Sequence, residues 1–157
     1  AQPCPMPSRK FMPVVRALIE SARGFERCSG LHVRELGLTP AQFDIVATLG
    51  NTEGMTCKEL GQKTLITKGT LTGVLDRLAD KGLLERTASP DDGRSWITRL
   101  TPSGQKLFEK IFPLHLQHLE PLFSSFSDSE LANMQQQLQR LRTAFDAHNA
   151  SLQEHAA

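Results

Sequence analysis

The 157-residue sequence predicts a mainly α-helical protein with one small β-hairpin. Three observations predict this fold class. Helix-start signals recur along the chain, with Thr or Ser followed three residues later by Gln or Glu. Apolar residues recur at steps of three and four between these starts, which is the period of a helix. Two strand-like runs flank one segment rich in turn residues, and they indicate a single hairpin.

The helix starts are marked by capping residues. They lie at Thr39, Thr56, Thr67, Thr101 and Ser127. An earlier helix is expected to begin near Pro13, after a flexible arm over residues 1–10 in which alternate prolines prevent a helix. Pro113 and Pro121 lie inside the helix that follows Thr101. Because proline lacks a backbone N–H, we expect a kink or break there.

The middle of the chain predicts a helix-turn-helix followed at once by a hairpin. A short helix runs from Thr56 to about Lys63, and a second runs from Thr67 to about Lys81, where Gly82 is placed to end it. The strands are expected at 83–87 and 95–100, around the turn at 89–93. A helix-turn-helix with such a wing is a DNA-binding architecture, which we assign to residues 38–100.

The second helix has two different faces. Leu71, Val74, Leu75 and Leu78 share one face and are expected in the core. The opposite face has no bulky apolar residue and includes two glycines, each of which costs up to about 1 kcal/mol inside a helix. Close approach to the wall of a major groove compensates for this cost, although a plain solvated face is the alternative. The DNA-contacting candidates on this helix are Thr67, Lys68, Gly69, Thr70, Thr72, Gly73 and Arg77.

The tip of the hairpin carries Arg94 beside two aspartates. An arginine at a wing tip suits the narrow, negative minor groove. The alternative is that Arg94 pairs with Asp91 and Asp92 and only holds the loop. The net charge is +1, but residues 56–99 hold eight Lys or Arg against six Asp or Glu, whereas residues 127–157 hold two against four. This distribution favours DNA contact through the middle of the chain.

Four segments together resemble the MarR family of bacterial transcription regulators. They read LITKGTLTGVLDRL at 65–78, KGLLER at 81–86, SPDDGR at 89–94 and RLTPSG at 99–104. The resemblance extends over about residues 10–148. It implies a homodimer that reads pseudo-palindromic, double-stranded operator DNA, with the helix from Thr67 in the major groove and Arg94 in the minor groove. Asp92 and Arg86 are then the residues that support the wing.

The resemblance also implies one domain over residues 11–157, in which 11–36 and 101–152 form dimerisation helices. An apolar seam in the last helix supports a dimer independently, because its members recur at alternating steps of three and four residues. They are Leu131, Met134, Leu138, Leu141, Phe145, His148 and Leu152, of which His148 is the one polar interruption. The first helix adds another apolar stripe, which includes Val15 and Leu18. The alternative is an amphipathic helix that packs within its own subunit.

Most family members repress and are released by a small aromatic or anionic ligand, a metal or an oxidant. The effector candidates here are His32, Arg34, Cys28 and Cys57. A zinc alternative arises because Cys28 and His32 share one helix face, and His115 and His118 another. A redox alternative rests on Cys28 or on Cys57 at a helix start. The peroxide-sensing branch pairs its cysteine with tyrosines, and this chain has none. We predict no cofactor and no bound metal.

Several classes of protein are excluded or disfavoured by the sequence. It contains no GxSxG, phosphate loop or HExxH, so we predict that the protein is not an enzyme. No apolar run reaches the roughly 18 residues of a membrane span. Three widely spaced cysteines without CxxC favour a reducing, cytoplasmic setting, at the nucleoid for a DNA-binding regulator. The remaining rival is a winged helix that binds protein instead of DNA.

Overall fold

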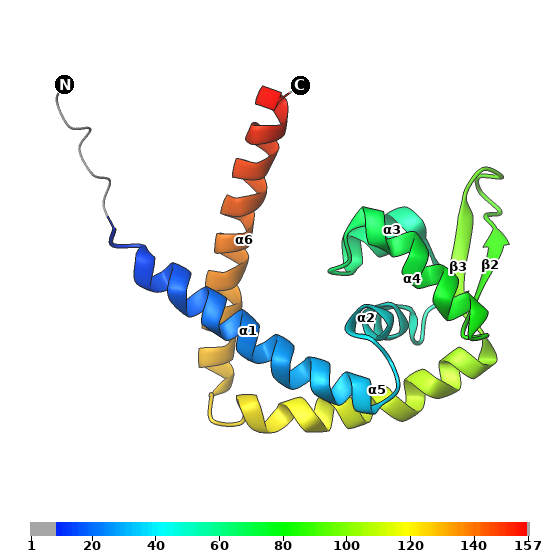
Figure 1. Ribbon diagram of the computed structural model, residues 1–157, viewed down its shortest axis with the longest axis horizontal. Helices are drawn as coiled ribbons and strands as arrows, with labels where there is room; N and C mark the ends of the chain where they lie inside the picture. Colours follow the sequence, from blue (N-terminus) through cyan, green and yellow to red (C-terminus); the bar gives the residue numbers. More distant parts are fainter. Residues whose placement is uncertain (1–8, 157) are drawn as a thin grey trace. The chain divides into compact units, whose positions relative to one another are not determined.

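The computed structural model describes residues 9–156, and side chains as far as residue 153. Within that range the elements follow in the order α1 (Met12–Glu35), α2 (Pro40–Leu49), β1 (Met55–Thr56), α3 (Cys57–Lys63), α4 (Lys68–Asp80), β2 (Leu84–Ala88), β3 (Trp96–Leu100), α5 (Pro102–Phe123) and α6 (Asp128–Ala156) (Figure 1). The predicted fold class, mainly helical with a small wing, is confirmed. Most of the arm predicted for residues 1–10 lies outside the described residues.

Local capping chemistry sets most of the helix starts. Complete capping boxes join Thr39 to Gln42 and Thr56 to Glu59. Ser127 and Glu130 exchange the same pair of bonds, because Ser127 N donates to Glu130 Oε2 (2.8 Å) and Glu130 N donates to Ser127 Oγ (3.3 Å). Thr67 differs from expectation. It is the N-cap residue of α4, but its side chain pairs with Thr70 Oγ1 at 2.9 Å instead of accepting a backbone N–H.

Of the kink or break expected in α5, the break is absent, and the kink stays a prediction. α5 continues as one helix from Pro102 to Phe123, through Pro113 and past Pro121. Proline has a φ angle compatible with a helix and removes only one backbone donor. Phe108 and Ile111 are buried in the core, and this packing holds the helix through Pro113. Pro121 lies in the last turn, so only Leu122 and Phe123 follow it in the helix.

The sheet has three antiparallel strands in the order β1-β3-β2. The hairpin of β2 and β3 was predicted, and its register pairs Leu84 with Leu100 and Ala88 with Trp96. The two-residue strand β1 was not predicted; it pairs Met55 with Thr98. Because β1 directly precedes α3, this pairing anchors the start of the helix-turn-helix on the wing.

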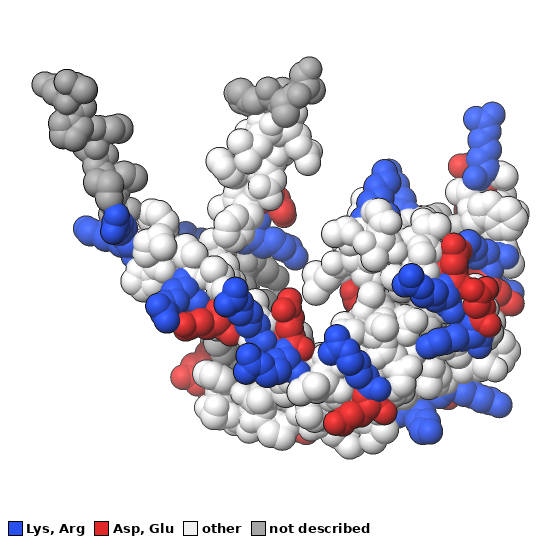
Figure 2. All heavy atoms as spheres, viewed as in Figure 1, with Lys and Arg blue, Asp and Glu red and all other residues white. Residues whose placement is uncertain are grey.

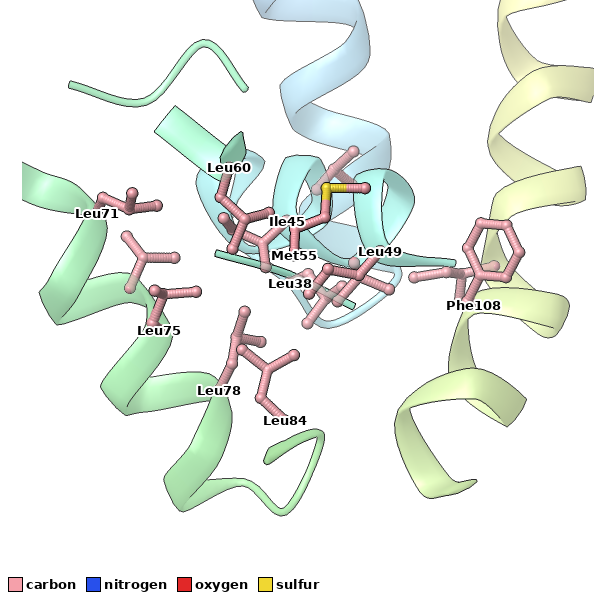
Figure 3. Packing of buried hydrophobic residues seen from close by; sticks show 14 residues of the cluster. Leu38, Ile45, Leu49, Met55, Leu60, Leu71, Leu75, Leu78, Leu84 and Phe108 are labelled. Carbon is pink, nitrogen blue, oxygen red and sulfur yellow. The ribbon is translucent and has the colours of Figure 1, made fainter. Parts of the chain in front are cut away.

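The core lies among α2, α3, α4 and the base of the wing, with Val33 of α1 and with Phe108 and Ile111 of α5 packed into the same cluster (Figure 3). The predicted apolar face of α4 is confirmed: Leu71, Val74, Leu75 and Leu78 are all buried. They meet Ile45 and Leu49 of α2, and Leu60 of α3 closes the cluster. Burying one such aliphatic side chain contributes about 1.5–3 kcal/mol, so the core holds the orientation of α4 firmly.

The chain divides into two units, one up to His118 and the other from Leu119 onward. The first contains α1 to β3 and most of α5, and the second contains the end of α5 and α6. The single domain expected over residues 11–157 stays a prediction. No helix in the described part of the chain has the length and apolarity needed to cross a membrane.

Candidate nucleic-acid interface

The outer face of α4 is open. Gly69 and Gly73 are exposed, and a Cβ added at either position would have no atom within 4 Å among its described surroundings. The other candidate residues on or beside this face are also exposed: Thr67, Lys68, Thr70, Thr72 and Arg77. α4 therefore presents small and polar groups outward, over a backbone that a flat surface or groove wall can approach closely.

The turn before α4 is fixed by a contact from outside the helix-turn-helix. The carboxylate of Asp44 on α2 accepts a hydrogen bond from the backbone N–H of Leu65 (2.8 Å). Thr64 donates its hydroxyl to the carbonyl of Leu60 (2.7 Å). At the other end, Gly82 adopts φ +73° and ends α4, as its sequence position predicted. These contacts define where α4 begins, where it ends and which face it turns outward.

An ion pair joins the wing to α4. Arg86 Nη2 on β2 lies 2.8 Å from Asp76 Oδ1 on α4. Sequence reasoning assigned Arg86 to wing support but missed this partner. The pair removes a free carboxylate from the outer face of α4, where phosphate groups would be repelled by it.

The wing tip is held by backbone bonds, and Arg94 projects from it. Asp92 Oδ1 accepts the N–H of Arg94 (3.0 Å), and the carbonyl of Asp92 accepts the N–H of Ser95 (3.0 Å). The guanidinium of Arg94 makes no hydrogen bond or ion pair with any residue in the range 9–153. The loop is therefore closed by Asp92 and Ser95, not by an Arg94 ion pair. Figure 2 shows Lys or Arg side chains at the hairpin tip and over one part of α3 and α4, and a mixture of Lys or Arg with Asp or Glu beside the wing.

Comparison with known proteins identifies the family. A family model described as "MarR family" matches residues 36–95. The transcriptional regulator MhqR of Bacillus subtilis is 32% identical over 134 residues, covering 85% of this chain and 92% of its own length. The chain belongs to the MarR family of transcription regulators. A mutant MarR from E. coli, solved in complex with operator DNA, has a TM-score of 0.73 at 25% identity and covers 85% of this chain and 96% of its own. AbsC of Streptomyces coelicolor has the same fold, with a TM-score of 0.81 at 20% identity over 92% of this chain and 99% of its own.

A small pocket in this MarR-family chain lies between α4 and the wing. It is lined by Cys57, Thr72, Arg86, Trp96 and Thr98. Trp96 is 59% exposed, whereas Thr98 is 1% exposed and its hydroxyl has no hydrogen-bond partner within the described part of the chain. Sequence reasoning named Cys57 but missed Trp96 and Thr98. The strand predicted at 95–100 includes both residues, but their approach to Thr72 depends on the packing of α4 against the wing.

The four effector candidates do not form one site in the structure. Arg34 is exposed near the end of α1, and Cys57 is exposed at the start of α3. Cys28 and His32 of α1 instead meet His115 and His118 of α5. Burial lowers the pKa of His115, and His32 and His118 lower it further. The two helix faces whose pairings were predicted separately therefore come together.

The predicted dimerisation residues remain largely uncovered in the single chain. On α6, Leu138 is 56% exposed and Phe145 is 51% exposed, while Leu131 and Leu141 are partly buried. Phe123 and Leu131 contribute to an apolar groove that continues along α6 past Leu138. On α1, Val15 and Leu18 are partly buried. The α6 seam is therefore an apolar surface that its own unit does not fill.

Proposed function

We propose that the protein is a repressor that binds a pseudo-palindromic operator as a homodimer. The observation that carries this proposal is the open outer face of α4, which occurs in the same unit as a wing-tip arginine whose guanidinium pairs with no residue in the described part of the chain. In this proposal α4 enters the major groove and Arg94 reaches the adjacent minor groove. The assigned contact residues are Thr67, Lys68, Gly69, Thr70, Thr72, Gly73, Arg77 and Arg94.

The dimensions of a helix and a groove support this assignment. A helix with its side chains is about 10–12 Å wide, and the major groove is about 12 Å wide. A helix face of small residues enters such a groove more deeply than a face of long ones. Gly69 and Gly73 supply that face, and Thr72 lies beside them with a hydroxyl that hydrogen-bonds base edges or phosphates.

The electrostatics of the interface also support DNA as the partner. Lys68 and Arg77 flank the open face, and Arg86 neutralises its acidic residue, Asp76. Phosphate neutralisation makes binding strongly dependent on salt, which distinguishes a DNA partner from a protein partner. A regulator of this kind acts on chromosomal DNA, so we place its action in the cytoplasm, at the nucleoid.

A homodimer is supported by the uncovered seam on α6. Leu138 and Phe145 are exposed apolar residues seven positions apart, which is one heptad. They continue an a/d pattern that suits pairing with a second copy of the chain. A two-fold dimer carries two α4 helices and therefore reads two half-sites about one helical turn apart.

The test combines footprinting with hydrodynamics. The protein is used to select fragments from genomic DNA, and the selected sites are footprinted. We expect two protected half-sites centred about 10 base pairs apart, a dimer on the DNA by sedimentation, and affinity that falls steeply as salt is raised. The proposal would be refuted by a single unrepeated half-site, by a monomer on DNA, or by a DNA affinity that does not change with salt concentration. Small aromatic acids added to the same footprint test the expected release by an effector.

A further inference from the structure

Three imidazoles and one thiol meet between α1 and α5 in the first unit. His32 Nδ1 lies 2.9 Å from His115 Nδ1. The rings of His32 and His118 stack in parallel with centroids 4.1 Å apart. Cys28 Sγ lies 3.4 Å from His118 Nε2, and Ser29 Oγ lies 3.1 Å from His115 Nε2. We call Cys28, His32, His115 and His118 the histidine cluster.

The histidine cluster is not arranged as a metal site. Among the described residues, no group of three or more His, Cys, Asp or Glu side chains could hold a metal ion. The parallel stack of His32 on His118 does not fit the shell of a zinc ion, and a ring nitrogen of His32 is already engaged with His115. The zinc alternative raised by the sequence is therefore not favoured. The chemistry left to three imidazoles is the uptake of protons near neutral pH.

The contact between His32 and His115 limits how many protons the cluster can hold. A neutral imidazole has one N–H group and one bare nitrogen, whereas an imidazolium has two N–H groups. One cation can donate to a neutral partner, but two cations would direct one N–H group against another. The stack of His32 on His118 sets the same limit, because like charges at this distance repel each other. The cluster therefore accommodates one added proton, and a second proton breaks a contact.

No opposite charge compensates for protons added to the cluster. The titratable groups that face His115 are His32 on α1 and His118 on α5, while α2 contributes the uncharged ring of Phe43. In the described part of the chain, no hydrogen bond or ion pair joins the cluster to an Asp, Glu, Lys or Arg side chain. His115 is 4% exposed. Burial, and then the nearness of His32 and His118, hold the pKa of His115 below its ordinary value.

Two adjacent residues of α2 connect the cluster to the DNA interface. The ring of Phe43 meets His115 edge-on, with centroids 4.6 Å apart. The next residue, Asp44, accepts the backbone N–H of Leu65 in the turn before α4. A change at His115 therefore acts on the part of α2 that fixes the start of α4. Residues 33–114 contain no histidine, so no imidazole of the DNA interface itself takes up a proton.

We propose that the histidine cluster is a proton-sensitive latch, which ties α1 to α5 at neutral pH and weakens DNA binding when acidification opens it. Solvent supplies the protons, which bind to imidazole nitrogens, and the N–H···N contact between His32 and His115 is lost. The effect on DNA rests on the proposed function, whereas the effect on folding does not.

The sign of the effect on folding follows from where the protons bind. In the unfolded chain a histidine takes up its proton near its ordinary pKa of about 6.5. In the folded chain His115 takes up its proton only at lower pH, because its pKa is lowered. Folding is therefore favoured above about pH 6.5 and weakens as the pH falls below it, by about tenfold in the equilibrium constant per pH unit for each proton that only the unfolded chain holds.

The first arm of the test uses the full chain without DNA. Urea unfolding is measured at about pH 7.5 and 5.5, a range in which carboxylates stay ionised. We expect the unfolding equilibrium constant of the wild type to rise by at least about tenfold at the lower pH. NMR of the imidazoles should show that His115 gains its proton at a lower pH in the folded chain than in urea. An unfolding equilibrium that does not depend on pH, or a His115 that titrates alike in both states, would overturn the latch.

Two glutamine variants assign the pH dependence to the cluster. His115→Gln is neutral at every pH and should remove most of the rise, whatever its own stability at pH 7.5. The matched variant His148→Gln removes the histidine of the α6 seam and should keep the rise. An equal rise in His115→Gln, or a rise that disappears in His148→Gln, would overturn the assignment. His118→Gln, at an exposed position of the cluster, repeats the test with less risk to folding and should lower the rise in part.

The second arm measures operator affinity by anisotropy at the same two pH values, where circular dichroism shows the chain to be folded. Added protons make the chain more positive, which by itself would strengthen binding to phosphates. The latch requires the opposite sign: we expect the wild type to bind at least about fivefold more weakly at the lower pH, and His115→Gln to change less. Affinity that is unchanged or raised by acid would overturn the proposal. If no DNA is bound at either pH, the proposed function fails, and the unfolding arm alone decides whether the latch exists.

Discussion

Arg86 Nη2 on β2 lies 2.8 Å from Asp76 Oδ1 on α4, so a single ion pair spans the wing and the helix that we assign to the major groove. Both side chains are partly solvent-exposed, and exposed ion pairs contribute only about 0–1 kcal/mol to folding. The pair therefore matters chiefly for charge: without it, the carboxylate of Asp76 would face the phosphates alone.

The first prediction concerns this pair. Arg86→Ala should weaken operator binding at least several-fold while changing the free energy of unfolding by less than about 1 kcal/mol. The double variant Asp76→Asn with Arg86→Ala should recover part of the lost affinity, because the unpaired carboxylate is gone. Fluorescence anisotropy on an operator duplex measures both. If the double variant binds no better than Arg86→Ala, Arg86 acts through its own phosphate contact instead of by neutralising Asp76.

The second prediction concerns the wing tip. Arg94→Ala should weaken operator binding by about 1–3 kcal/mol, as expected for loss of one inserted arginine. The melting temperature should change little, because the carboxylate and the carbonyl of Asp92 accept backbone N–H groups and close the loop without the Arg94 side chain. Arg99→Ala is the matched control: it removes the same charge from the base of the same hairpin, where Arg99 pairs with Glu85 (2.6 Å). Equal losses of affinity in the two variants would count against a special role for the tip.

The third prediction concerns the dimer. Replacing Leu138 and Phe145 by Glu should convert the protein to a monomer, because two charges then occupy an apolar seam. Both side chains are more than half exposed in the single chain, so helix content should be retained. Analytical ultracentrifugation and circular dichroism measure the two outcomes. A variant that remains dimeric would place the dimer interface elsewhere.

The fourth prediction concerns Gly104, at the start of α5. A Cβ at this position would collide with the backbone carbonyl of Leu83 and press against Leu100. A backbone neighbour yields less readily than a side chain, so Gly104→Ala should destabilise the protein by about 1–3 kcal/mol, although alanine is the better helix former. Urea unfolding measures the change. An unchanged or raised midpoint would mean that the junction between the wing and α5 is looser than described.

Local chemistry explains what the sequence predicted well. Thr56 and Glu59 lie three residues apart, so their capping box can be predicted from the sequence without any tertiary contact. The same holds for Gly82 at the end of α4. Pairings between distant segments are different. The two residues of β1 carry no strand pattern of their own, and they become a strand only because β3 lies beside them.

The candidate sites divide in the same way. The i, i+4 spacing of Cys28 and His32 predicted a shared face, but not that α5 would bring His115 within 2.9 Å of His32. The ion pair of Asp76 with Arg86 likewise required the hairpin to fold back against α4. Pro113 shows the opposite error: a local rule predicted a kink or a break, and α5 continues unbroken because burial of the neighbours of Pro113 outweighs the lost backbone bond.

The last prediction concerns Gly73, where helix stability and DNA affinity should change in opposite directions. A Cβ at Gly73 meets no atom within 4 Å, so a side chain there extends into open space. Gly costs about 1 kcal/mol relative to Ala within a helix, so Gly73→Ala and Gly73→Leu should both raise the free energy of unfolding by several tenths of a kcal/mol.

The two variants should differ in their affinity for DNA. A methyl group adds little bulk, whereas an isobutyl group holds the helix away from the base edges. We expect Gly73→Ala to bind the operator nearly as well as wild type and Gly73→Leu to bind at least about tenfold more weakly, a loss of about 1.4 kcal/mol. Urea unfolding and anisotropy on the same preparations test both parts. Wild-type affinity in the leucine variant would show that this face of α4 does not approach DNA. Destabilisation by alanine would show instead that Gly73 is covered by a neighbouring element.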